Sequence, residues 1–157
     1  MNEKILMGGG DTLLVWTPEN RRTVGISERI VTKPEILASP EQYFDTRYLF
    51  STWGMPTFTV EEIRRCLPSL QAVFYAAGSV RGFADSFLDA GVAVFSARAA
   101  NAVPVAEYTV AQILLANKGF FASCRGMHGG AAWQEMRDRS QKSPGNYGAT
   151  LESSGAA

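Results

Sequence analysis

Residues 72–95, AVFYAAGSVRGFADSFLDAGVAVF, carry the clearest alternation of strand and helix patterns in the chain. The apolar run 72–76 predicts a buried strand, and Gly78-Ser79 predicts a turn directly after it. Residues 80–90 carry apolar side chains at helical spacing, and 92–95 predict another strand. A strand, a helix and a second strand joined by such short connections predict two parallel strands with a right-handed crossover.

The same alternation extends to both sides of this stretch. Residues 48–53 are rich in aromatic and β-prone residues and predict a strand, while Thr59 and Glu62 form a capping-box pattern that opens a helix to Cys66. Residues 101–116 are apolar on nearly every side, which predicts a long buried helix with Asn101 as its cap. We therefore expect an α/β fold, a flavodoxin-like parallel sheet flanked by helices.

The two ends of the chain give weaker signals. Residues 12–16 and, less clearly, 30–32 are strand candidates, and 18–22 open a helix. Residues 125–157 are rich in glycine and turn-prone, and 151–157 have no apolar period. We expect these last residues to be a disordered C-terminal tail.

Composition excludes several classes of protein. Fifteen basic residues balance fifteen acidic ones, so no nucleic-acid partner and no membrane-surface partner is expected. The longest apolar run, 103–116, is interrupted by polar residues and too short to span a bilayer. Cys66 and Cys124 are too few for a disulfide framework and lack the spacing of a metal site. These features predict a cytoplasmic protein with no metal.

Three segments carry a resemblance to a known family. They are 76–83 (AAGSVRGF), 101–110 (NAVPVAEYTV) and 51–56 (STWGMP). The chain resembles the N-terminal substrate-binding domain of D-isomer-specific 2-hydroxyacid dehydrogenases, NAD(P)-dependent oxidoreductases that exchange hydride with 2-hydroxy or 2-keto acids. The resemblance implies a substrate-binding lobe over 1–124, including an inter-domain helix, and over 125–157 a linker and the truncated start of the NAD-binding domain.

The resemblance also implies what this chain does not carry. The family's catalytic arginine, glutamate and histidine belong to the inserted nucleotide-binding domain. Residues 144–150 resemble the approach to its first strand, but 151–157 supply neither an apolar strand nor GxGxxG. We therefore expect no catalytic residues and no turnover by this chain alone. NAD or NADP would serve the full-length parent, with neither held tightly here, and the inter-domain face left exposed would favour self-association.

Candidate site residues follow from the same reading. Backbone amides after the strand at 72–76 suit a small acid anion, and the resemblance assigns this role to Ala77, Gly78, Ser79 and Val80. An ordinary tight turn between strand and helix is the alternative. Tyr108 resembles a residue at the nicotinamide end of the cofactor; the alternative is a core tyrosine.

Other conspicuous residues have simpler explanations. Arg81 is expected to be a solvated arginine, and Glu107 a carboxylate that stabilises a helix N-terminus. His128 lies in a glycine-rich segment and is not expected to be catalytic, and Gly8-Gly-Gly10 lacks the Lys-Ser/Thr of a P-loop. Two alternative functions remain open: a stand-alone flavodoxin-like module that binds a small anion or a protein, or a fragment that docks onto a separately made nucleotide-binding domain.

Overall fold

The computed structural model of the protein describes residues 3–130 and 132–150. The chain forms two compact units, Met1–Ala102 and Val103–Ala157. The division expected from the resemblance, at residue 124, stays a prediction. The tail expected at 151–157 lies outside the described residues.

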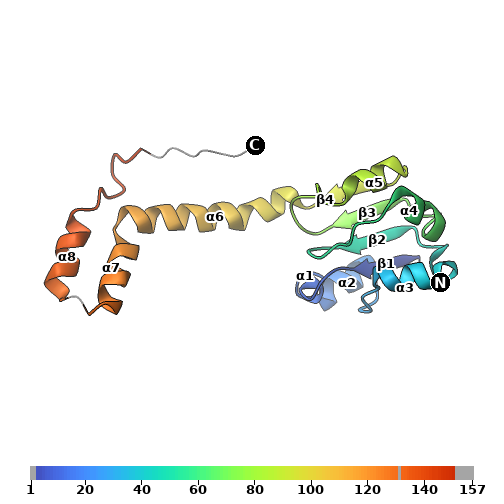
Figure 1. The fold of residues 1–157 in the computed structure, drawn as a ribbon, viewed down its shortest axis with the longest axis horizontal. Coiled ribbons are helices and arrows are strands. Elements are labelled where there is room, and N and C mark those ends of the chain that lie inside the picture. Colours follow the sequence, from blue (N-terminus) through green and yellow to red (C-terminus); the bar gives the residue numbers. More distant parts are fainter. Residues whose placement is uncertain (1–2, 131, 151–157) are drawn as a thin grey trace. The chain divides into compact units, whose positions relative to one another are not determined.

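The first unit is built on a four-stranded parallel sheet, as predicted (Figure 1). Its strands are β1 (Lys4–Met7), β2 (Tyr48–Ser51), β3 (Ala72–Tyr75) and β4 (Ala93–Ser96), in the spatial order β1-β2-β3-β4. Ile30 forms an isolated parallel bridge with Leu6 on the free side of β1. If the segment at Ile30 is counted as the second strand along the chain, the strands lie in the spatial order 2-1-3-4-5, which is the flavodoxin-like order.

One face of the sheet packs against the main hydrophobic core. The elements that cover it are α3 (Lys33–Ala38), the 3-10 helix η1 (Pro40–Tyr43), α4 (Val60–Cys66) and α5 (Ala84–Asp89). Phe87 of α5 is fully buried there and meets the rings of Phe58 and Phe83 edge to face. This core fixes the position of the chain that connects β3 to α5, which is the segment of functional interest.

The other face is only partly covered. The short helices α1 (Thr12–Val15) and α2 (Pro18–Val24) bring Trp16 edge to face with Phe50. Phe50, Phe74 and Phe95 lie in register on three neighbouring strands, and their rings stack at 5.2 Å between centroids. Phe95 remains 54% exposed, so this face of the sheet is open at β4.

Side-chain caps set two helix starts on the core side. Thr59 accepts a hydrogen bond from the Glu62 amide at 3.2 Å, and the Glu62 carboxylate accepts one from the Thr59 amide at 2.9 Å, as the pattern predicted. Lys33 of α3 pairs with the Glu62 carboxylate at 2.7 Å. The Lys33 side chain, with the Thr59 amide, holds the pKa of Glu62 below its usual range. This ion pair ties the first turns of α3 and α4 together.

Some expectations for the N-terminal half are wrong. Residues 12–15 form α1 and Trp16 caps it, rather than 12–16 forming a strand, because the Thr12 hydroxyl donates to the Gly9 carbonyl and the chain turns at once after the glycines. Leu14 is then left 76% exposed, so its apolar character does not reflect a strand. The first strand of the sheet is Lys4–Met7, which the sequence analysis did not identify.

The helix after β3 and the next helix also differ from expectation. α5 begins at Ala84 rather than residue 80, and the chain leaves it through Gly91 in the left-handed conformation (φ 85°). α6 spans Arg98–Asn117, so Asn101 lies inside its first turns instead of capping it, and Pro104 is interior. No residue of α6 is buried, so the expectation of a buried helix is wrong for this chain.

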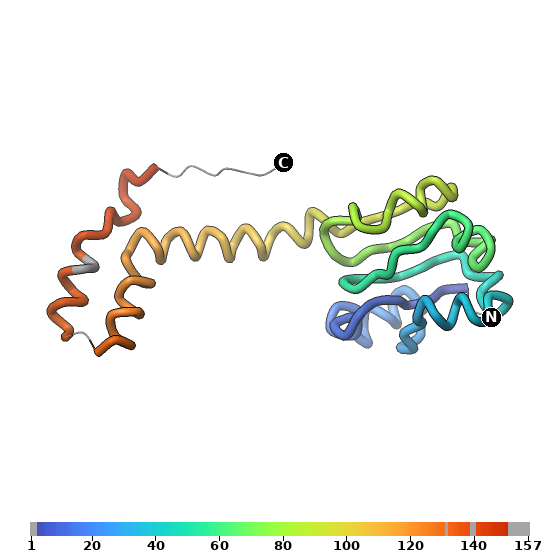
Figure 2. Tube along the Cα trace, viewed as in Figure 1, coloured from blue at the N-terminus to red at the C-terminus, as the bar shows by residue number. Residues whose placement is uncertain are grey.

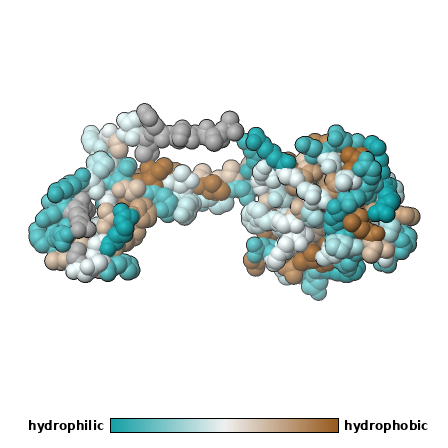
Figure 3. Space-filling model, viewed as in Figure 1, coloured by the Kyte–Doolittle hydropathy of each residue, from teal (hydrophilic) through white to brown (hydrophobic). Residues whose placement is uncertain are grey.

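The second unit is helical. After α6, the left-handed Gly119 (φ 72°) leads into α7 (Phe120–His128), and α8 (Trp133–Gln141) follows and packs against α7 (Figure 2). The glycine-rich stretch from residue 125 therefore contains helical segments as well as turns. Hydrophobic side chains are visible along α6 (Figure 3), and the large exposed ones include Val103, Val105, Val110 and Leu114. No helix within the described ranges has the length and apolar character needed to cross a membrane.

Candidate functional site

The predicted site residues lie in the loop that leaves the carboxyl end of β3. Ala77 is buried beneath it, Gly78 and Val80 are half-buried, and Ser79 is exposed. Within the described ranges, the backbone amides of residues 77–82 have no hydrogen-bond acceptor, and pairing resumes at Phe83, whose amide donates to the Val80 carbonyl at 3.1 Å. A run of free amides at a partly exposed bend is a set of unused donors.

The carbonyl groups of the same loop are held in place. The Thr52 hydroxyl donates to the Ala76 carbonyl at 3.3 Å. The Ser96 hydroxyl lies 2.9 Å from the Gly78 carbonyl and 3.5 Å from that of Ala77, and it accepts from the Arg98 amide at 3.1 Å. In a trans peptide the C=O of one residue and the N–H of the next point in opposite directions. These bonds therefore turn the amides of Ala77, Gly78 and Ser79 away from Thr52 and Ser96.

Asn101 lies directly beside the loop. A Cβ placed on Gly78 would be 3.0 Å from Asn101 Nδ2, so glycine is what allows the Asn101 side chain to approach. The Asn101 amide nitrogen thus supplies another donor next to the free backbone amides. Sequence reasoning treated Asn101 only as a helix cap. One signal in the sequence could have suggested that Asn101 lies near the site: it opens the segment 101–110, and Gly78 lies in the segment 76–83, and both segments resemble motifs of the same family.

The end of a helix contributes less here than the sequence suggested. With α5 starting at Ala84, residues 77–80 precede its first turn, and the helix has only six residues. Helix-dipole effects fall off within a turn, so the donors of this loop act as individual amides. The prediction that this helix starts at residue 80 was wrong because residues 81–83 form a turn before it. In this turn Phe83 packs into the core against Tyr75, at 5.0 Å between ring centroids.

The surroundings of the loop combine one cation with a buried aromatic floor. Arg81 is exposed and lines a hollow of about 160 Å³ together with Thr57, Asp85 and Ser86. Beneath the loop, Tyr75 is 9% exposed, and burial raises the pKa of its hydroxyl. Arg81 shares this hollow with the Asp85 carboxylate, so the charged side chains there balance, and Tyr75 stays neutral over the physiological range. The free backbone amides are therefore the feature of this loop that suits a small anion.

The remaining predicted residues are placed as follows. Tyr108 lies on α6 in the second unit and is 67% exposed, so it is not a core tyrosine in this structure, and its cofactor role stays a prediction. Glu107 is interior to α6, since that helix starts at Arg98, so it is not at a helix N-terminus as expected. His128 ends α7 with Nδ1 2.9 Å from the Cys124 carbonyl oxygen, a contact within its own helix.

The glycine turn after β1 does not fit a dinucleotide. In a flavodoxin-like sheet the phosphate-binding crevice lies between β1 and its neighbour β2. Here the Gly9 amide donates to the Trp53 carbonyl at 2.9 Å, and a Cβ on Gly54 would lie 2.5 Å from the Gly9 nitrogen. Backbone from the two strand ends closes this crevice, so the described residues of this unit provide no pyrophosphate cradle there.

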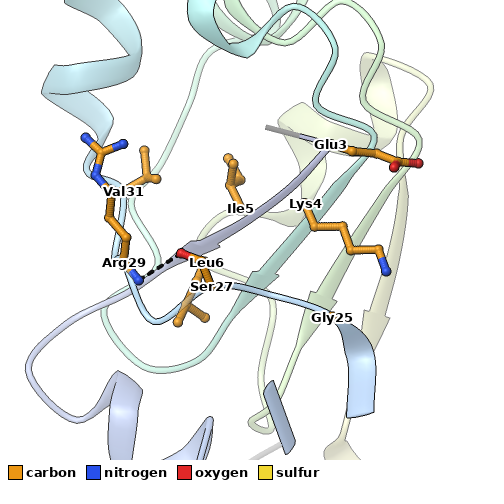
Figure 4. A pocket seen from close by; sticks show the side chains of 8 residues that line it. All are labelled: Glu3, Lys4, Ile5, Leu6, Gly25, Ser27, Arg29 and Val31. Atoms are coloured by element: carbon orange, nitrogen blue, oxygen red, sulfur yellow. Dashed lines mark hydrogen bonds between the residues drawn. The ribbon is translucent and has the colours of Figure 1, made fainter. Parts of the chain in front are cut away.

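A larger hollow lies at the opposite edge of β1 (Figure 4). It measures about 340 Å³ and opens where Ile30 pairs with β1 at one position only. Its charged groups already have partners: Lys4 Nζ donates to the Val24 carbonyl at 2.7 Å, and Arg29 pairs with Glu35 at 2.7 Å. The free donors of the β3 loop therefore make the better candidate site.

Across the part of the chain that the structure describes, no three His, Cys, Asp or Glu side chains come together as they would around a metal ion. The sequence matches no model of a known protein family, and it matches none of the curated proteins.

Proposed function

We propose that this chain is the substrate-binding lobe of an NAD(P)-dependent oxidoreductase acting on D-2-hydroxy acids or 2-keto acids. The observation that carries the proposal is the run of unpaired amides at residues 77–80, fixed from behind by hydroxyls and bordered by the Asn101 side-chain amide. The resemblance of 76–83 and 101–110 to the dehydrogenase motifs supports it, since these two segments contain the facing residues Gly78 and Asn101.

The chemistry of these donors fits a small 2-keto acid. A carboxylate accepts several hydrogen bonds at once, and charge-assisted bonds from N–H donors are the stronger kind. The amides of Gly78 and Ser79 are turned to the same side by Ser96, so they can address one carboxylate. Asn101 Nδ2 offers a donor for the neighbouring keto or hydroxyl oxygen.

The lobe binds and orients the acid in this proposal, and the hydride-transferring groups belong to polypeptide outside these residues. NAD or NADP would supply the hydride in the complete enzyme. No step is assigned to residues of this chain beyond holding the carboxylate and the adjacent oxygen. The closed crevice between Gly9 and Gly54 agrees with a lobe that takes the acid and leaves the nucleotide to another domain.

The test is a comparison of ligands at equilibrium. Pyruvate should bind the purified chain weakly, because a ligand of so few atoms has little surface to contribute. Acetate and inorganic phosphate, which lack the 2-oxygen beside a carboxylate, should bind more weakly still. Replacing Asn101→Ala should reduce pyruvate affinity while leaving acetate affinity unchanged. Equal binding of all three anions would instead favour a general anion-binding module, and no binding would refute both.

A further inference from the structure

The free edge of the sheet at β4 presents unpaired backbone groups. The Ala93 amide donates to the Gln71 carbonyl at 2.9 Å, and the Ala97 amide to the Tyr75 carbonyl at 3.0 Å. Alternate residues of a strand face opposite sides, so the N–H and C=O of Val94 and Ser96 point away from β3. β4 is the last strand of the sheet, and no described backbone group pairs with this side.

This edge lacks the devices that usually protect one. Natural edge strands carry a charge, a proline or a bulge that prevents further pairing. Ala93–Ser96 contains no charged residue and no proline, and it pairs with β3 in unbroken register. The stacked row of Phe50, Phe74 and Phe95 ends at this edge, with half of Phe95 exposed. Both the backbone and the side chains of β4 are therefore open to an added strand.

We propose that the occupant is β4 of a second copy of this chain, paired antiparallel about a two-fold axis at Val94. In this register each Val94 exchanges two hydrogen bonds with its symmetry mate, since both of its backbone groups face outward. The outward amide of Ser96 meets the carbonyl of Val92 in the other copy. On the aromatic face, the small Ala93 lies opposite the bulky Phe95 of the other copy, which extends the row without a clash.

Charge complementarity favours a second copy over an unrelated peptide. Asp89 is the last residue of α5 and Arg98 the first of α6. Each charge is placed against the dipole of its own helix, and neither has an ion-pair partner within the described ranges. Arg98 follows the carboxyl end of β4 and Asp89 precedes its amino end, so antiparallel pairing about Val94 brings Arg98 of one copy to the side of the sheet where Asp89 of the other copy lies. The two-fold axis creates this contact twice.

The predicted dimer is weak. Pairing of one short strand gives an interface below the size of standard stable complexes. Sedimentation equilibrium of the full chain should therefore show a monomer–dimer equilibrium that shifts with protein concentration. Raising the salt concentration should favour the monomer, because the paired charges are exposed and screened.

Variants of the two charges test the interface. Asp89→Arg and Arg98→Glu should each raise the dimer dissociation constant about tenfold, since two attractive contacts become repulsive. The double variant Asp89→Arg with Arg98→Glu restores opposite charges and should return the constant to near the wild-type value. Val94→Pro, which removes an outward donor and no hydrogen bond to β3, should abolish dimerisation. Arg22→Glu, an exposed reversal on α2, is the matched control and should change nothing.

Several results would overturn the proposal. One is a wild-type chain that stays monomeric at every concentration. Another is association that persists unchanged in Val94→Pro and in both charge reversals, which would place the contact on another surface. If circular dichroism shows that Val94→Pro does not fold, the rescue by the double charge variant decides alone, and failure of that rescue counts against the interface.

Discussion

Replacing Ser96→Ala tests whether the anchored carbonyls create the candidate site. The Ser96 hydroxyl donates to the Gly78 carbonyl at 2.9 Å and accepts from the Arg98 amide at 3.1 Å. Net contributions of about 1 kcal/mol per hydrogen bond are typical of proteins, and Ser96 is exposed enough for water to replace part of each. We therefore expect a loss of about 1 kcal/mol in the free energy of unfolding for the two bonds together.

The effect on binding should exceed what this loss of stability alone would cause. Without the hydroxyl, the peptide planes on either side of Gly78 are free to rotate, and their amides must be ordered again by the ligand. Ordering a few torsions on binding costs about 1 kcal/mol, so the dissociation constant for pyruvate should rise about fivefold. Urea unfolding followed by circular dichroism gives the stability, and an equilibrium titration of the folded variant gives the affinity.

Ser69→Ala is the matched control for this experiment. Ser69 is exposed, lies in a turn before β3, and has no side-chain hydrogen bond within the described ranges, so its replacement should leave both measurements unchanged. The reasoning would be refuted if Ser96→Ala bound pyruvate as tightly as the wild type. It would also fail if both serine variants lost the same affinity.

Three further substitutions test the fold that supports the site. Gly54→Ala should lower the free energy of unfolding by at least about 3 kcal/mol, because φ is +83° and the new Cβ would meet backbone atoms. Its control is Gly10→Ala, whose Cβ would meet nothing within 4 Å and which should be nearly neutral in the same urea unfolding series. Phe87→Ala should lower the free energy of unfolding by about 3–5 kcal/mol, because the ring is fully buried; a loss below half of this, measured by thermal and urea unfolding, would contradict the assigned core. Glu62→Gln keeps a capping side chain but loses the ion pair with Lys33. The ion pair with Lys33 and the Thr59 amide hold the folded pKa of Glu62 below its usual range, so their contribution is present at neutral pH and is lost as the pH falls through the folded pKa. Stability measured from pH 7 downward should therefore be less acid-sensitive in the variant than in the wild type.

The elements that the sequence predicted well are those with both a pattern and a boundary. β3 and β4 are apolar runs enclosed by turn residues, and α4 opens with a capping box that the structure reproduces. At these three elements local hydrogen bonding and burial favour the same secondary structure, so the local sequence is enough to predict it. β1 was missed because Lys4–Met7 is a short run with a lysine at its start, and only pairing with β2 makes it a strand.

The errors arise where an outcome depends on residues far away in the chain. The apolar pattern of α6 predicts burial, but burial needs a second surface, and no residue of α6 is buried in this structure. Asn101 is a residue type that often caps helices, yet α6 already starts at Arg98. The Arg98 amide donates to the Ser96 hydroxyl, which therefore satisfies the start of the helix in place of Asn101. The result is that Asn101 moves from an expected cap to a position beside Gly78.

The position of the loop after β3, in contrast, followed from topology, whereas its binding role came from the resemblance and stays a prediction. The carboxyl ends of parallel strands share one edge of the sheet, so a glycine-containing loop after β3 had to lie at that edge. The direction of its amides could not be predicted, since it depends on hydroxyls from two other segments, Thr52 and Ser96. A sequence pattern indicates which atoms are available, whereas only the fold determines which way they point.

Binding at the β3 loop can be observed atom by atom in a titration of the isotope-labelled chain with pyruvate, followed through its backbone amide resonances. We expect saturable shifts, with one shared dissociation constant, for the amides of Gly78, Ser79 and Val80 and for the side-chain amide of Asn101. Resonances from the hollow beside Lys4 and Arg29 should stay in place. A folded chain whose loop amides do not move, or in which the shifts gather at another surface, would contradict the central claim.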